Sequence, residues 1–184
     1  MRVEFILLVL IFSSLSPPQD STVNLTFEPE SQRFEQAVEE YRKVWASEGK
    51  RIIEALESVS GLRFQEREVR AIVFEGPSNS GGPAGPMKMR ASYPVDVKKA
   101  TLAHELGHRM NFQIKKRPKE LDEHRILFLY LYDVWEKLYG KTFADEQVTI
   151  EKGRKGLYDY DSAWKWALSM TKEERAARFK ALMQ

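Results

Sequence analysis

The chain has 184 residues, which is enough for one domain with a modest hydrophobic core. Hydrophobic residues make up 42% and charged residues 30%, a balance typical of globular proteins that excludes wholesale disorder. The 29 Lys and Arg residues against 27 Asp and Glu leave a net charge of +2, so no nucleic-acid partner is expected. Because there are no cysteines, any transition-metal site must use histidine and carboxylate ligands.

The N-terminus has the pattern of a secretory signal. An early Arg2 is followed by an apolar run from Phe5 to Phe12 and then by small residues. The run is shorter than the roughly 20 residues that span a bilayer. We therefore expect residues 1–16 to be a signal peptide or an uncleaved signal anchor, with a buried N-terminal strand as the alternative. The predicted location is extracytoplasmic, either secreted or envelope-associated, and an uncleaved segment would tether the protein to the membrane.

The next segments predict a linker and then the start of a single domain. Residues 17–30 are rich in Pro, Ser, Thr and Asp and are expected to be a linker, while residues 31–184 form the domain. Phe34, Val38, Tyr41 and Trp45 recur at helical spacing, so they share one face of a long amphipathic helix. Gly61 is a natural end for this helix.

Three short segments after this helix are candidate strands: 62–65, 69–74 and 87–93. The segment 76–86 between the last two is rich in Gly and Pro and is predicted to be a flexible loop, acting either as a mobile flap or as a plain connector.

The C-terminal half is predicted to be helical. Residues 122–139 are strongly apolar and indicate a core helix, and further helices are expected near 145–154 and 161–169. The last helix begins at Thr171, where Thr171 and Glu174 form a capping box. The expected fold class is therefore α+β, mostly helical, with a small mixed β-sheet before the helix that carries the motif described next.

The run His104-Glu105-Leu106-Gly107-His108 is the strongest chemical signal in the chain. Two histidines at i and i+4 project from the same helix face, at the separation that two ligands of a tetrahedral zinc ion need. Glu105 can lie beside the metal site without binding the metal and act as a general base. Gly107 leaves room for close packing against another element, and Asp96 is the expected N-cap of this helix.

The segment from Thr101 to His108 resembles the extended signature of zincin metallopeptidases, with uncharged residues before and between the ligands. Arg109 departs from that signature, which prefers an uncharged residue there. The resemblance covers roughly residues 62–140. It implies a zincin-like domain with bound Zn²⁺, a peptide or protein substrate, and hydrolysis of peptide bonds through a zinc-bound water activated by Glu105. It also implies that an edge strand of the sheet pairs with an extended substrate.

The third metal ligand decides which zincins the chain is similar to. Metzincins need a Gly at position 111 and a His at 114, but this chain has Asn111 and Ile114. The next helix offers Glu123, which would be gluzincin-like, or His124, which would give a three-histidine site similar to SprT-like zincins. His124 is favoured because neutral imidazole is a good zinc ligand and all three histidines would then have a role. Glu123 would then orient a histidine ligand by a hydrogen bond.

Several further residues are candidates for supporting roles. Tyr158 and Tyr160 lie on a predicted loop and can donate to the oxyanion of the reaction intermediate, as can Tyr93; half-buried packing is the alternative for each. Asp122 is a candidate N-cap of the next helix. Asp133 is a weaker candidate for a hydrogen bond to a metal-binding histidine.

Three functions are compatible with these features. The first is an active zinc metallopeptidase, a metalloendopeptidase-like hydrolase. The second is a zincin-fold envelope protein with a binding or scaffolding role and little or no peptidase activity. The third is a helical envelope protein with a fortuitous motif. Glu105 favours the first, because a purely structural zinc site has no need of a general base.

Overall fold

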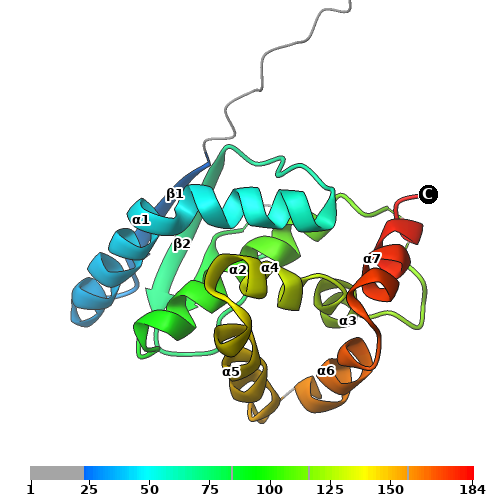
Figure 1. The fold of residues 1–184 in the computed structure, drawn as a ribbon. Coiled ribbons are helices and arrows are strands. Elements are labelled where there is room, and N and C mark those ends of the chain that lie inside the picture. Colours follow the sequence, from blue (N-terminus) through cyan, green and yellow to red (C-terminus); the bar gives the residue numbers. More distant parts are fainter. Residues whose placement is uncertain (1–22, 84, 116, 157) are drawn as a thin grey trace, which may run out of the picture.

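The computed structural model describes residues 23–83, 85–115, 117–156 and 158–184 (Figure 1). The signal peptide or anchor predicted at 1–16 lies outside these residues. Within them, no helix combines the length and the apolar character needed to cross a membrane. The elements in chain order are β1 (Asn24–Pro29), the short 3-10 helix η1 (Gln32–Phe34), α1 (Glu35–Ser60), β2 (Glu68–Phe74), β3 (Met87–Arg90), α2 (Val95–Asn111), α3 (Glu123–Phe128), α4 (Leu131–Tyr139), α5 (Lys141–Lys152), α6 (Tyr160–Leu168) and α7 (Lys172–Ala181).

The fold is α+β, as predicted, with one small sheet in the order β1-β2-β3. Both strand pairs are parallel, whereas a mixed sheet was expected. Among the described residues, the one antiparallel contact is an isolated bridge between Asn79 and Lys88, through which the loop after β2 covers the outer edge of β3. This edge is therefore not open to pair with an extended substrate, as the resemblance to zincins implied. In Figure 1 the strands lie on the left of the molecule, α5 lies at the bottom, and α6 and α7 lie on the right.

The prediction of a linker at 17–30 is wrong for its second half. Asn24–Pro29 is the edge strand β1, which pairs with β2 along its whole length. Leu25 and Phe27 alternate with polar neighbours and are buried, which is the period-two pattern of a strand with one face in the core. Residues 17–22 lie outside the described part of the chain.

The other strand predictions are partly confirmed. The segment 69–74 forms β2, and 87–93 forms the shorter β3, which ends at Arg90. Residues 62–65 form no strand. The backbone N–H of Phe64 there donates to the side chain of Glu57 at 3.0 Å, so the segment is held against the end of α1 and not against the sheet.

The long first helix is confirmed as α1, and it ends at Gly61, whose φ of 75° lies in the left-handed region that favours glycine. Tyr41 is fully buried on the inner face of α1, and its hydroxyl donates to the backbone oxygen of Arg90 at 2.9 Å. This bond fixes α1 against the outer edge of β3.

The predicted helix at 122–139 is two helices, α3 and α4, separated at Leu129 and Tyr130. The buried hydroxyl of Tyr130 donates to the backbone oxygen of Gly107 at 3.0 Å and lies 3.1 Å from Asn111 Oδ1. The residue at the break therefore contacts α2 through its hydroxyl. The last three helices are confirmed, although α5 begins earlier than predicted, at Lys141, and the capping box at Thr171 is present.

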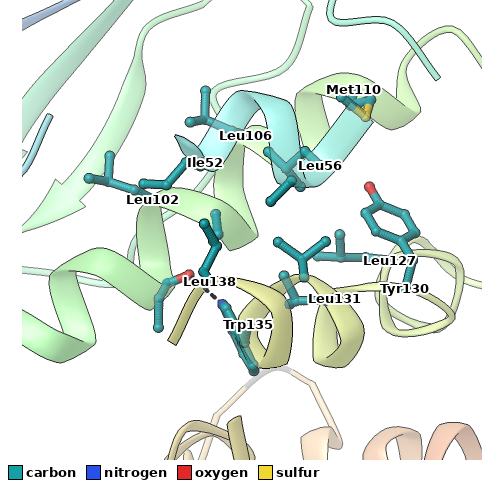
Figure 2. Packing of buried hydrophobic residues seen from close by; sticks show 14 of the residues in the cluster. Ile52, Leu56, Leu102, Leu106, Met110, Leu127, Tyr130, Leu131, Trp135 and Leu138 are labelled. Carbon is teal, nitrogen blue, oxygen red and sulfur yellow. Dashed lines mark hydrogen bonds between the residues drawn. The ribbon is translucent and has the colours of Figure 1, made fainter. Parts of the chain in front are cut away.

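The hydrophobic core surrounds α2, the helix that carries the motif. Figure 2 shows side chains of α1 and α4 converging on it, and Trp135 of α4 donates its indole N–H to the backbone oxygen of Ala100 at 3.2 Å. The labelled residues are Ile52, Leu56, Leu102, Leu106, Met110, Leu127, Tyr130, Leu131, Trp135 and Leu138. All residues from 100 to 111 are buried, so the motif sits inside the protein.

Candidate metal centre

The motif helix is packed closely enough to need its glycine. A Cβ added at Gly107 would lie 2.5 Å from Leu127 Cδ1 and 3.2 Å from the Tyr130 hydroxyl. This confirms the expected close approach of another element. The predicted N-cap is wrong: Pro94 caps the helix, and Asp96 lies in its first turn, where it accepts a hydrogen bond from Lys99.

The three histidines of the chain come together. One ligand atom from each of His104, His108 and His124 lies within 4.8 Å of the other two. His104 Nε2 and His108 Nε2 are 3.1 Å apart. Zinc–nitrogen bonds of about 2.0–2.1 Å in a tetrahedron place two ligand atoms about 3.3 Å apart, so the spacing of His104 and His108 fits two imidazole ligands of one zinc ion.

Glu151 of α5 orients the first histidine and was missed by the sequence analysis. Its Oε1 lies 2.8 Å from His104 Nδ1, and its Oε2 accepts the indole N–H of Trp164 at 2.8 Å. Because Nδ1 is engaged in this way, Nε2 of His104 is directed at the other histidines. The spacing contained a signal, since Ala144, Val148 and Glu151 fall on the buried face of α5.

The protonation states of this pair follow from their contact. Burial alone would lower the pKa of His104, but the adjacent Glu151 carboxylate outweighs burial and raises it. Burial likewise would raise the pKa of Glu151, and the His104 imidazole outweighs it and lowers the pKa. The pair therefore favours a charged carboxylate that accepts the His104 Nδ1 proton.

The other two histidines are held neutral. Burial lowers the pKa of His108 well below its usual value, and the charge of His104 lowers it further. Burial and His104 together lower the pKa of His124 to about 4. Neutral imidazoles carry the lone pair that a metal ligand needs.

The third member of the cluster is His124 and not Glu123. The side chain of Glu123 is 63% exposed and pairs with Arg117 at 2.7 Å, outside the cluster. Asp122, as predicted, caps α3 by accepting the backbone N–H of Arg125 at 2.9 Å. This cap fixes the first turn of the short helix that carries His124.

The two candidate oxyanion donors differ in what their hydroxyls contact. Tyr158 stacks on His124, with ring centroids 4.1 Å apart, but its hydroxyl donates to Asp122 at 2.8 Å. The Tyr160 hydroxyl lies 3.2 Å from His124 Nε2. Burial, followed by the charge of Glu151, raises the pKa of Tyr160 to about 12, so its hydroxyl keeps its proton. Tyr160 is therefore the better placed donor.

Glu105 is buried beside the cluster, with a relative exposure of 4%. Burial raises its pKa to about 7, against the opposing charges of His104 and Arg154. Among the described residues its carboxylate makes no hydrogen bond, in contrast to Glu151. A carboxylate without a fixed partner and with a pKa near neutrality can accept and release a proton.

Two further candidate residues, Asp133 and Tyr93, contact arginines. Asp133 is buried and binds Arg175 of α7, with Oδ1 2.8 Å from Nη2, so it does not support a histidine. Tyr93, the third candidate oxyanion donor, is half-buried and lies against the guanidinium of Arg154, 5.6 Å from its ring centroid.

Arg109, the departure from the zincin signature, anchors the Gly/Pro loop to α2. Its Nη1 donates to the backbone oxygens of Ser80, Gly82 and Gly85 at 2.6, 3.2 and 3.0 Å. Its Nε donates to Glu66 at 2.7 Å. These contacts favour a fixed connector over a mobile flap for the described part of the loop.

Comparisons of the chain with models of known protein families, with curated proteins and with solved structures found no match. The site is therefore interpreted from its own chemistry.

Proposed function

We propose that the protein is a zinc-dependent hydrolase that cleaves peptide bonds, with His104, His108 and His124 as metal ligands and Glu105 as general base. The convergence of the three imidazoles within 4.8 Å carries this proposal. The resemblance of the motif to zincin metallopeptidases supports it, and a third histidine favours the SprT-like arrangement over the gluzincin-like one. An extracytoplasmic location remains a prediction from the N-terminal residues.

Each residue of the site has a defined part in the proposed reaction. When bound, Zn²⁺ would act as a Lewis acid toward water and the substrate carbonyl. Glu105 takes the proton from the attacking water and delivers it to the leaving amine. The Tyr160 hydroxyl donates to the developing oxyanion. Glu151 keeps His104 in the orientation and tautomer in which Nε2 faces the metal.

The decisive experiment compares wild type with Glu105→Gln for zinc content and for cleavage of a peptide library. We expect one zinc ion per chain in both proteins, and a decrease of about 10²–10⁴-fold in kcat for the variant, because general base catalysis contributes that much. Glu123→Gln is the matched control, since it changes a neighbouring exposed glutamate and should retain zinc and activity. His124→Ala should lose zinc.

The outcomes separate the alternatives. Equal cleavage by wild type and Glu105→Gln would contradict the proposed mechanism. Zinc binding without cleavage of any peptide would support the binding or scaffolding role. A wild-type protein that binds no zinc would indicate a fortuitous motif.

A further inference from the structure

The guanidinium of Arg154 lies beside the candidate metal centre and has an incomplete set of partners. Arg154 follows the end of α5, and 23% of its side chain is exposed. Its Nη1 is 3.4 Å from Glu151 Oε1, and its Nε is buried without a hydrogen-bond partner among the described residues. A buried N–H without a partner is unfavourable, so this arrangement needs an explanation.

One intervening side chain separates Arg154 from each of two histidines, His104 and His124. It contacts Glu151, which holds His104, and it packs on Tyr160, whose hydroxyl lies 3.2 Å from His124. Arg154 therefore contacts two side chains that touch the histidine cluster.

Two aromatic rings hold the guanidinium. Its central carbon lies 5.6 Å from the ring centroid of Tyr93 and 5.7 Å from that of Tyr160. Contacts of this kind between a guanidinium and a ring restrict its orientation. The N–H groups of such a guanidinium form a fork that matches the two oxygens of a carboxylate.

The charges around Arg154 also favour an anion. The acidic groups closest to it are Glu105 and Glu151, and Arg154 itself is the cation. With a divalent ion on the histidines, the ion and Arg154 would together carry three positive charges. The two carboxylates carry two negative charges, so one positive charge would remain. An incoming carboxylate would neutralise that excess.

We propose that Arg154 anchors the substrate by binding a carboxylate of the peptide close to the bond that is cleaved. The carboxylate is either the C-terminus of the peptide or an acidic side chain. This inference rests on the proposed function, because it takes peptides as the molecules that reach the histidine cluster.

The test measures peptide binding to zinc-loaded Glu105→Gln, in which cleavage is suppressed. The probes are N-acetylated peptides in two kinds of matched pair. In the first kind, both peptides have an amidated C-terminus and differ by Glu against Gln at one position. In the second kind, both peptides lack acidic side chains and differ by a free against an amidated C-terminus. We expect the charged member of one kind of pair to bind about tenfold more tightly, as a charge-assisted hydrogen bond predicts. The kind of pair that responds identifies the source of the carboxylate.

Adding Arg154→Gln should abolish the difference within the pair, and Arg154→Lys should restore part of it. Arg51→Gln is the matched control, because Arg51 also pairs with a glutamate (Glu48) and lies 6.0 Å from a tyrosine ring (Tyr139), but in α1. Zinc content and far-UV circular dichroism should be the same in all these proteins.

Equal weakening of charged and neutral peptides by Arg154→Gln would overturn the inference, because Arg154 would then act through Glu151 and not on the substrate. The absence of any difference between charged and neutral peptides would overturn it as well. Failure of the proposed function would give a different result from failure of this inference. Peptides would then bind through Arg154, but the wild-type protein would cleave none of them. Cleavage that requires Glu105 and does not depend on Arg154 would leave the function intact and remove this inference.

Discussion

At the scale of single residues, the orientation of the histidine cluster depends on a carboxylate outside it. Glu151 accepts from both His104 and Trp164, so it connects the motif helix α2 with α5 and α6. A partner of this kind fixes the ring orientation of a ligand and raises its basicity. The zinc affinity of the proposed site should therefore depend on a residue 47 positions away from the histidine that it contacts.

We predict that Glu151→Gln weakens zinc binding by about 10–100-fold, because the amide is a weaker acceptor and no longer carries the compensating charge. The dissociation constant can be measured by competition with a chelator. Glu146→Gln changes an exposed glutamate on the same helix and serves as the control. Equal affinities in the two variants would show that Glu151 has no role in holding the metal.

The sequence predicted that the two histidines of α2 share a site, but it left the third member of the cluster open between two adjacent residues. The choice depends on which way a short helix turns its side chains, and this follows from the Asp122 cap and the stacking of Tyr158 on His124. Glu151 could not be assigned to the site, because a glutamate on an amphipathic helix is usually solvated.

At the scale of elements, the position of α2 is set by its contact with the segment that joins α3 and α4. The break at Leu129 and Tyr130 allows the Tyr130 hydroxyl to reach the backbone of Gly107. Hydrophobic periodicity predicts one helix there, because the break is made by a tertiary hydrogen bond and not by Gly or Pro. The strand β1 was missed for a related reason: its flanking Pro and Ser residues indicated a linker, and its partner strand lies beyond a 26-residue helix.

The contact between α2 and the α3–α4 segment leads to a stability prediction. Gly107→Ala should decrease the free energy of unfolding by about 1–3 kcal/mol, because the new methyl group would overlap Leu127. Denaturation in urea measures the change. Gly153→Ala is the control, since a Cβ there meets only ordinary contacts at 3.4 and 3.6 Å. A loss of the same size in both variants would indicate a general cost of removing glycine.

At the scale of the whole molecule, the C-terminal helix is attached through a buried ion pair. Arg175 of α7 and Asp133 of α4 have side-chain exposures of 6% and 4%, and Arg175 also donates to the backbone oxygen of Met170 at 2.8 Å. Neither charge has free access to water, so each depends on the other. The α+β class could be predicted because the helices are long and periodic, but this long-range pair has no local signature.

We expect Arg175→Met to destabilise the protein by about 3–5 kcal/mol, since it leaves the buried Asp133 with only the more distant Lys172, at 4.0 Å, as a counter-charge. Thermal and urea denaturation would reveal the loss. Lys180→Met, on the exposed face of the same helix, should have little effect. Full stability of Arg175→Met would show that water reaches Asp133.

The closed edge of β3 has a consequence for how the protein behaves in concentrated solution. The outward-facing N–H and carbonyl of Lys88 bond to Asn79, the N–H of Arg90 donates to the Ser78 hydroxyl, and its carbonyl accepts from Tyr41. An open edge strand offers unpaired backbone groups on which a second chain can assemble and start aggregation. Because these backbone groups are already bonded within the molecule, β3 is protected against edge-to-edge self-association.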